Sequence, residues 1–187
     1  METKEYLIPT KLKEMSFGEY VRLLRAMEET KDDEDIFRNL IKVYIPEKHI
    51  RNMPVIDIQR IGLRLLKMLQ DKPKLQKVIK LNGQELYFHS ELIKITAGEE
   101  VDILSYQQDG LFKNLDKILA VLYRPAKLIT EYSYELEDYT GTGDRPELIA
   151  KYMSADVAAG AYVFFWNLMK LYLQDIEESS SHQHKQV

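Results

Sequence analysis

Hydrophobic residues recur at three- and four-residue steps along most of the chain, which is the spacing that places them on one face of an amphipathic helix. The pattern is clearest near the C-terminus, where Val157, Ala161, Phe164 and Leu168 share a face. This stretch is expected to form the longest helix and the central buried element. Helices are predicted over residues 16–27, 35–44, 54–69, 96–106, 111–122, 144–153 and 156–176.

Specific residues mark where these helices begin and end. A capping box places Ser, Thr or Asp before the first turn and an acid three residues later, so that side chains accept from backbone N–H groups the helix leaves unpaired. Pro46 and Pro125 end two helices, because proline disfavours helical backbone at the residue before it. The predicted caps are Ser16 with Glu19, Thr96 with Glu99, and Asp144 with Glu147.

The helical spacing breaks down over residues 78–88, where two short apolar runs flank Asn82-Gly83. Both turn residues tolerate the positive φ of a type I′ turn, so the segment predicts a two-residue β-hairpin. Residues 127–143, rich in Tyr, acids, Thr and Gly, are expected to form a long, partly extended connection.

The two halves of the sequence resemble each other. Residues 5–21 align without gaps on residues 85–101, and 37–42 parallels 112–117 further along. The alignment predicts two copies of one helical unit sharing a core, because neither copy buries much surface alone. Chance similarity between two capped helix pairs is the other interpretation.

The expected architecture is mainly α-helical, with two related helical units packed on a shared core and a small β-hairpin at residues 78–88 between them. Residues 1–75 are predicted to form the first unit, and residues 76–178 the hairpin with the second unit. A disordered tail is predicted for residues 179–187.

Composition narrows the function classes. The chain has 187 residues, 26 basic and 30 acidic side chains and a net charge of −4, which disfavours a general nucleic-acid binder but leaves a local basic patch open. The chain has no cysteine, which removes disulfides, thiolate nucleophiles and Cys-ligated metals. No apolar run approaches the length of a membrane span, and the N-terminus lacks the apolar stretch of a signal peptide.

Candidate chemistry is sparse, and no catalytic, metal-binding or cofactor-binding residue is predicted. His182 and His184 lie near the C-terminal end, where a solvated pair is the expected state. His89 is followed by Ser90 and Glu91, but adjacent side chains rarely point at one target. The sequence contains no nucleophile elbow, phosphate loop or dinucleotide fingerprint.

Acids and tyrosines alternate over residues 131–139, which indicates either a solvated connection or a strip that binds a partner. Aromatic side chains supply interface energy at a modest entropic cost. The last helix also carries three consecutive aromatic residues, one of which can remain outside the core. The residues predicted to contact a partner are Tyr132, Tyr134, Tyr139 and Trp166.

The sequence resembles small virion-structural or tail-assembly proteins of tailed bacteriophages, particularly phages of Bacteroides-type hosts. The resemblance implies protein–protein binding without catalysis or a cofactor, synthesis in the host cytoplasm, and partners that are other phage structural or assembly proteins or copies of the chain itself. It leaves retention in the virion open. It is carried by Asn82-Gly83 with Tyr87, residues 95–99 with Asp102, residues 117–125, and residues 156–158 leading to Phe164-Phe165.

The function expected from the sequence is therefore a non-enzymatic structural or tail-assembly protein that binds other proteins. One alternative is a small nucleic-acid-binding regulator that uses the basic cluster Lys72, Lys74, Lys77 and Lys80, joined on one face by Arg22 and Arg25. The other is an enzyme, which would need a concave site that gathers acids and His89 from distant segments.

Overall fold

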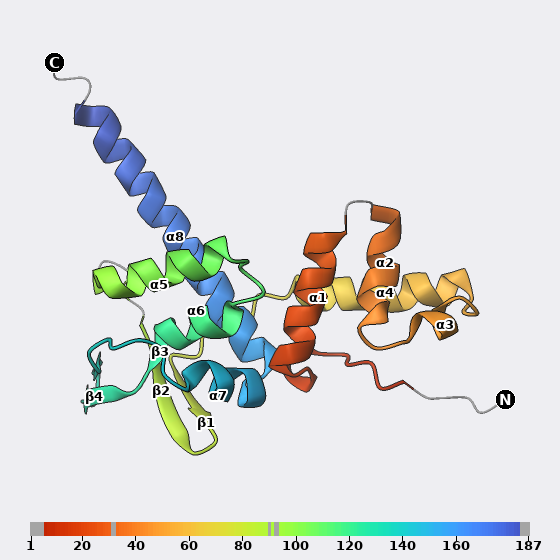
Figure 1. Ribbon diagram of the computed structural model, residues 1–187, viewed down its shortest axis with the longest axis horizontal. Helices are drawn as coiled ribbons and strands as arrows, with labels where there is room; N and C mark the ends of the chain where they lie inside the picture. The colour runs from red at the N-terminus through yellow and green to blue at the C-terminus, as the bar shows by residue number, and fades with distance from the viewer. Residues whose placement is uncertain (1–5, 31–32, 90, 92–93, 184–187) are drawn as a thin grey trace.

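A computed structural model describes residues 6–30, 33–89, 91 and 94–183 of the chain (Figure 1). The described part is mainly helical, with small antiparallel sheets, as the hydrophobic spacing predicts. None of its helices is both long enough and apolar enough to cross a membrane. The helices are α1 Phe17–Glu29, α2 Asp33–Lys42, α3 Glu47–Ile50, α4 Val55–Leu69, α5 Ala97–Gln108, α6 Leu115–Leu122, α7 Arg145–Tyr152 and α8 Ala155–Gln183, preceded by the 3₁₀ turn η1 Leu12–Glu14.

Two capping boxes are confirmed. The Ser16 hydroxyl accepts from the Glu19 backbone N–H, and the Glu19 carboxylate accepts from the Ser16 N–H at 2.9 Å. Thr96 and Glu99 make the same reciprocal pair at the start of α5. The third prediction is wrong: α7 forms, but the Asp144 side chain makes no capping bond, because its backbone is already helical rather than extended as an N-cap requires.

Helices α1 to α4 form one group, at the right of Figure 1. Within it, α2 packs directly on α4. The contact is close because Gly62 of α4 faces the Phe37 side chain, and a Cβ built on Gly62 would lie only 2.3 Å from the Cβ of Phe37. Glycine at this position therefore sets the distance between the two helices.

The predicted hairpin is confirmed as β1 Val78–Leu81 and β2 Gln84–Phe88, with positive φ at Asn82 and Gly83. A two-residue strand β3, Tyr123–Arg124, extends it to a sheet of order β1-β2-β3. The predicted connection over residues 127–143 contains most of a second hairpin, formed by β4 Ala126–Ile129 and β5 Tyr134–Leu136. Its turn is closed by Thr130, whose N–H donates to the Ser133 carbonyl at 2.8 Å.

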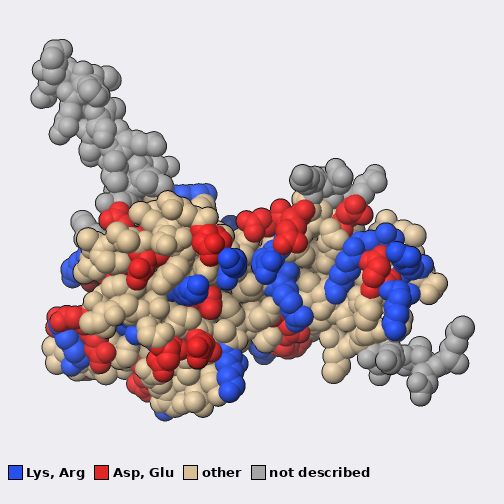
Figure 2. All heavy atoms as spheres, viewed as in Figure 1, with Lys and Arg blue, Asp and Glu red and all other residues tan. Residues whose placement is uncertain are grey.

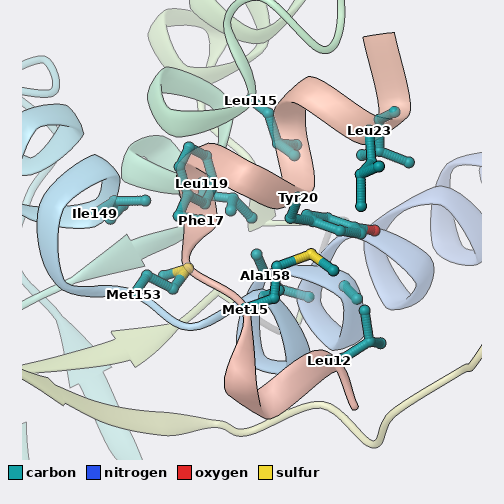
Figure 3. Close-up of a cluster of buried hydrophobic side chains, with 14 of the residues drawn as sticks. Leu12, Met15, Phe17, Tyr20, Leu23, Leu115, Leu119, Ile149, Met153 and Ala158 are labelled. Carbon is teal, nitrogen blue, oxygen red and sulfur yellow. The ribbon is translucent and has the colours of Figure 1, made fainter. Parts of the chain in front are cut away.

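One hydrophobic cluster joins the two helical groups (Figure 3). Phe17 and Tyr20 of α1 lie in it with Leu119 of α6, Met153 after α7 and Ala158 of α8. The backbone continues the connection, because the Phe17 N–H donates to the Met153 carbonyl and the Ala155 N–H to the Met15 carbonyl. The start of α1 is thus fixed to the junction between α7 and α8.

Helix α8, Ala155–Gln183, is longer than predicted: the prediction ended it at residue 176. The helix extends beyond the other helices in Figure 1. Its early turns pack on α1 and α6. Gly160 lies against the linker between the groups, where an added Cβ would meet the Lys74 carbonyl at 2.8 Å. Residues 184–187, which include His184 of the predicted tail, lie outside the described residues.

Candidate functional site

A cavity of about 860 Å³ opens between the first turn of α5, the end of β2 and the β4–β5 hairpin with the segment after it. Residues 132–139 line one side, and residues 96–99 line the other. His89 and Arg124 also line it. Most of the predicted partner-binding segment therefore forms a wall of this cavity.

Glu99 is fully buried beside this cavity and uses both carboxylate oxygens. Oε2 accepts from the backbone N–H and the hydroxyl of Thr96, each at 2.7 Å, which completes the capping box. Oε1 lies 2.6 Å from Nη2 of Arg124. The residue that starts α5 therefore also forms a buried ion pair with strand β3.

Arg124 uses the flat shape of its guanidinium to join several elements. Besides Glu99, its Nη1 donates to the Glu137 carbonyl at 3.0 Å, and its guanidinium carbon lies 5.4 Å from the centre of the Tyr139 ring. A lysine ammonium could not make this set of planar contacts. The pair of Glu99 and Arg124 therefore fixes β3, α5 and the segment after β5 relative to one another.

His89 completes the buried polar group, with its Nε2 3.7 Å from Oε1 of Glu99. Burial lowers the pKa of the His89 ring from its ordinary value, and the positive charge of Arg124 lowers it further, although the negative charge of Glu99 opposes both effects. The ring is therefore neutral near pH 7. A neutral imidazole can accept a proton. Its neighbour Glu99 already accepts hydrogen bonds from Thr96 and pairs with Arg124, so this carboxylate is poorly placed to exchange a proton with the ring.

The lowered pKa of His89 predicts a loss of stability in mild acid. Below a pH of about 6.5 the unfolded chain protonates His89 while the folded protein does not, so the free energy of unfolding falls as the pH drops from there toward the lowered pKa. Urea unfolding of the wild type and of His89→Gln across this pH range is expected to show a difference in the free energy of unfolding between the two proteins that changes with pH. A difference that stays constant would contradict this role of His89.

The structure places three of the four predicted contact residues at the cavity. Tyr134 donates its hydroxyl to the Phe88 carbonyl at 2.7 Å, and Tyr139 donates to the Asp102 carboxylate. Burial and the negative charge of Asp102 raise the pKa of Tyr139, which keeps its hydroxyl protonated as a donor. Tyr132 is 90% exposed at the cavity mouth, whereas Trp166 stacks on Tyr162 in α8 and does not line the cavity.

Three of the six basic residues of the nucleic-acid alternative line two separate hollows. Lys77 lines the cavity, whereas Arg22 and Arg25 line a groove with Lys42 between α1 and α2. Figure 2 shows Lys and Arg side chains spread over the visible face with Asp and Glu side chains among them. Within the described ranges, no three His, Asp or Glu side chains are arranged to hold a metal ion.

Sequence reasoning missed the ion pair of Glu99 with Arg124. The capping box identified Glu99, but it gave no sign that the second carboxylate oxygen would meet a residue 25 positions later. Comparisons of the chain with protein-family models, curated proteins and solved structures find no match. The cavity and its surroundings are therefore the basis for a functional assignment.

Proposed function

We propose that this chain is a non-enzymatic assembly protein that binds another protein through the β4–β5 hairpin at the mouth of the cavity. The observation that carries the proposal is a group of exposed hydrophobic residues on this hairpin. Leu128 is 55% exposed, Ile129 58% and Tyr132 90%. Leu128 and Ile129 are exposed on opposite sides of the hairpin, and Tyr132 lies in its turn, so the end of the hairpin is apolar on both sides. Large exposed apolar side chains gathered on one element are typical of protein interaction sites.

The base of the hairpin is held in place before any partner arrives. Tyr134 is bonded to the end of β2, and Lys127 of β4 forms ion pairs with Glu135 at 2.9 Å and Asp138 at 3.2 Å. Behind it, Arg124 holds the Glu137 carbonyl. A surface fixed in this way loses little conformational entropy on binding, which favours affinity.

The assembly role follows the resemblance to phage tail-assembly proteins, with other assembly proteins or copies of the chain as partners. We also propose that the two helical groups are copies of one unit. In support, α1 and α5 begin with the same capping box, and each is followed by a second helix that precedes a proline, Pro46 or Pro125.

An acid–base enzyme is the second candidate, because the cavity brings His89 and Glu91 together with Glu99 and Glu135 from separate segments. Binding is favoured because Glu91 pairs with Lys94 at 2.5 Å, Glu135 with Lys127 and Glu99 with Arg124. Carboxylates held in this way are poorly placed to exchange protons. His89→Gln separates the two functions, since it would abolish acid–base chemistry and leave the hairpin surface unchanged.

Site-specific photo-cross-linking tests the proposal. A photoreactive phenylalanine analogue at Tyr132 is expected to give one discrete protein adduct when the chain is expressed in the cell that makes it. The same analogue at Val101, which is 63% exposed on α5 and does not line the cavity, is the matched control and should give none. Equal adducts at both positions, or none at Tyr132, would contradict the proposed binding surface.

A further inference from the structure

The outward side of α4 carries an unusual combination of side chains. Val55 and Ile56 are 68% and 60% exposed, and Leu63 is exposed two turns after Ile56. The opposite side of the helix, with Leu65 and Met68, is buried. The exposed aliphatic residues are interleaved with Arg60, Arg64 and Lys67, and we call this set of six residues the α4 face.

The α4 face is positively charged and adjoins a hollow. Arg60 pairs with Asp57 at 3.2 Å, while no carboxylate of the described residues lies within ion-pair distance of Arg64 or Lys67. A space of about 450 Å³ lies against the helix and is lined by all three cations and Leu63, with Asp71 as the one acid among its lining residues, so its charge remains positive. The α4 face therefore suits a ligand surface that is both apolar and acidic.

The β4–β5 hairpin offers a surface of this kind. Leu128 lies beside Glu135 on one side of the hairpin, and Ile129 lies on the other side, because neighbouring residues of a strand point in opposite directions. Glu131 and Tyr132 lie in the turn and Asp138 follows β5, and we call these six residues at the exposed end of the hairpin the hairpin face. One cation, Lys127, pairs with two of the three acids, Glu135 and Asp138, and leaves the group negative. The hairpin lies at one end of the molecule and α4 in the helical group at the other (Figure 1), so the two faces do not meet within one chain.

We infer that the hairpin face of one copy docks on the α4 face of a second copy, so that the chain assembles head to tail. The inference rests on the proposed function and names a second copy as the partner of that binding surface. Apolar residues on both faces are buried by the contact, and opposite charges set its direction, since pairing two α4 faces or two hairpin faces would oppose like charges. A contact between different faces repeats from copy to copy and gives a ring or an open filament.

Charge-reversal variants test the inference through the mass in solution. Wild-type protein at low salt is expected to exceed the 22.0 kDa of one chain as its concentration rises, and to return toward it when salt is added. The α4 variant R60E/R64E/K67E makes the α4 face acidic, so that it would meet the acidic hairpin face of the next copy. The hairpin variant E131K/E135K/D138K makes the hairpin face basic, so that it would meet the basic α4 face of the next copy. Each alone is expected to associate about a hundredfold more weakly than the wild type.

Mixing the two variants gives the decisive comparison, because the acidic α4 face of one now complements the basic hairpin face of the other. An equimolar mixture is expected to regain the mass that each variant lacks by itself. The control variant K80E/K113E/K151E, which reverses three exposed lysines outside both faces, should associate like the wild type. Circular dichroism of each variant checks that it is folded.

A wild type that stays at 22.0 kDa at every concentration in low salt would overturn head-to-tail docking, as would a mixture no heavier than its components. These results leave the proposed function standing if Tyr132 still cross-links to a different protein. Loss of every Tyr132 adduct, with self-association intact in both reversed variants, would overturn both proposals.

Discussion

Replacing Glu99 by Gln is expected to lower the free energy of unfolding by about 3 to 5 kcal/mol, the cost of leaving one partner of a buried ion pair without the other. Arg124 would then keep its charge in a buried site, 2.6 Å from a neutral amide. Glutamine keeps the shape of the side chain and an oxygen for the Thr96 cap. Urea unfolding therefore measures chiefly the lost charge.

Glu100→Gln is the matched control, because Glu100 is the next residue in the same helical turn but is exposed. Its effect is expected to stay within about 0.5 kcal/mol. The double variant Glu99→Leu with Arg124→Leu should cost less than the sum of the two single changes, because it leaves no uncompensated charge. If Glu99→Gln were no more destabilising than Glu100→Gln, the pair would not hold the site together.

The second large effect is expected at Gly62. Gly62→Ala places a Cβ about 2.3 Å from the Cβ of Phe37, which is fixed to the α2 backbone and cannot rotate away. The two helices must separate, and overpacking of this kind costs about 1 to 3 kcal/mol, partly offset by the higher helix propensity of alanine. We expect a net loss of about 2 kcal/mol, measured by urea unfolding.

Gly18→Ala isolates the steric cause of that loss. Gly18 lies in the first turn of α1, with nothing within 4 Å of an added Cβ. The same substitution there gains helix propensity without a clash and is expected to stabilise the protein by up to about 1 kcal/mol. Effects of the same sign at both glycines would show that the close contact of α2 with α4 is not what Gly62 provides.

The elements predicted correctly from the sequence depend on residues close together in the chain. The Asn82-Gly83 turn and the capping box at Ser16 act over two to four positions, so the sequence contains all the information that they require. Asp144 fits the same pattern, yet its backbone is helical and its side chain makes no cap. Local patterns therefore predict the helix and miss its detailed start.

The site could be predicted only in part. Tyrosines and acids over residues 131–139 indicated either a solvated connection or a strip that binds a partner, and the structure places Tyr132, Tyr134 and Tyr139 at one cavity. The ion pair of Glu99 with Arg124 joins α5 to strand β3, which has only two residues. A strand of this length is too short to show an alternation of apolar and polar residues in the sequence. Hairpin β4–β5 was hidden for a similar reason, since a bulge between Ala126 and Leu128 interrupts its alternation.

Amide hydrogen exchange of the protein, alone and with the partner that Tyr132 captures, tests the proposed binding surface most directly. We predict slower exchange over residues 127–139 when the partner is present, since those residues carry the exposed hairpin and a wall of the cavity. Residues 127–139 that exchange at the same rate with and without the partner, while protection develops elsewhere, would contradict this prediction.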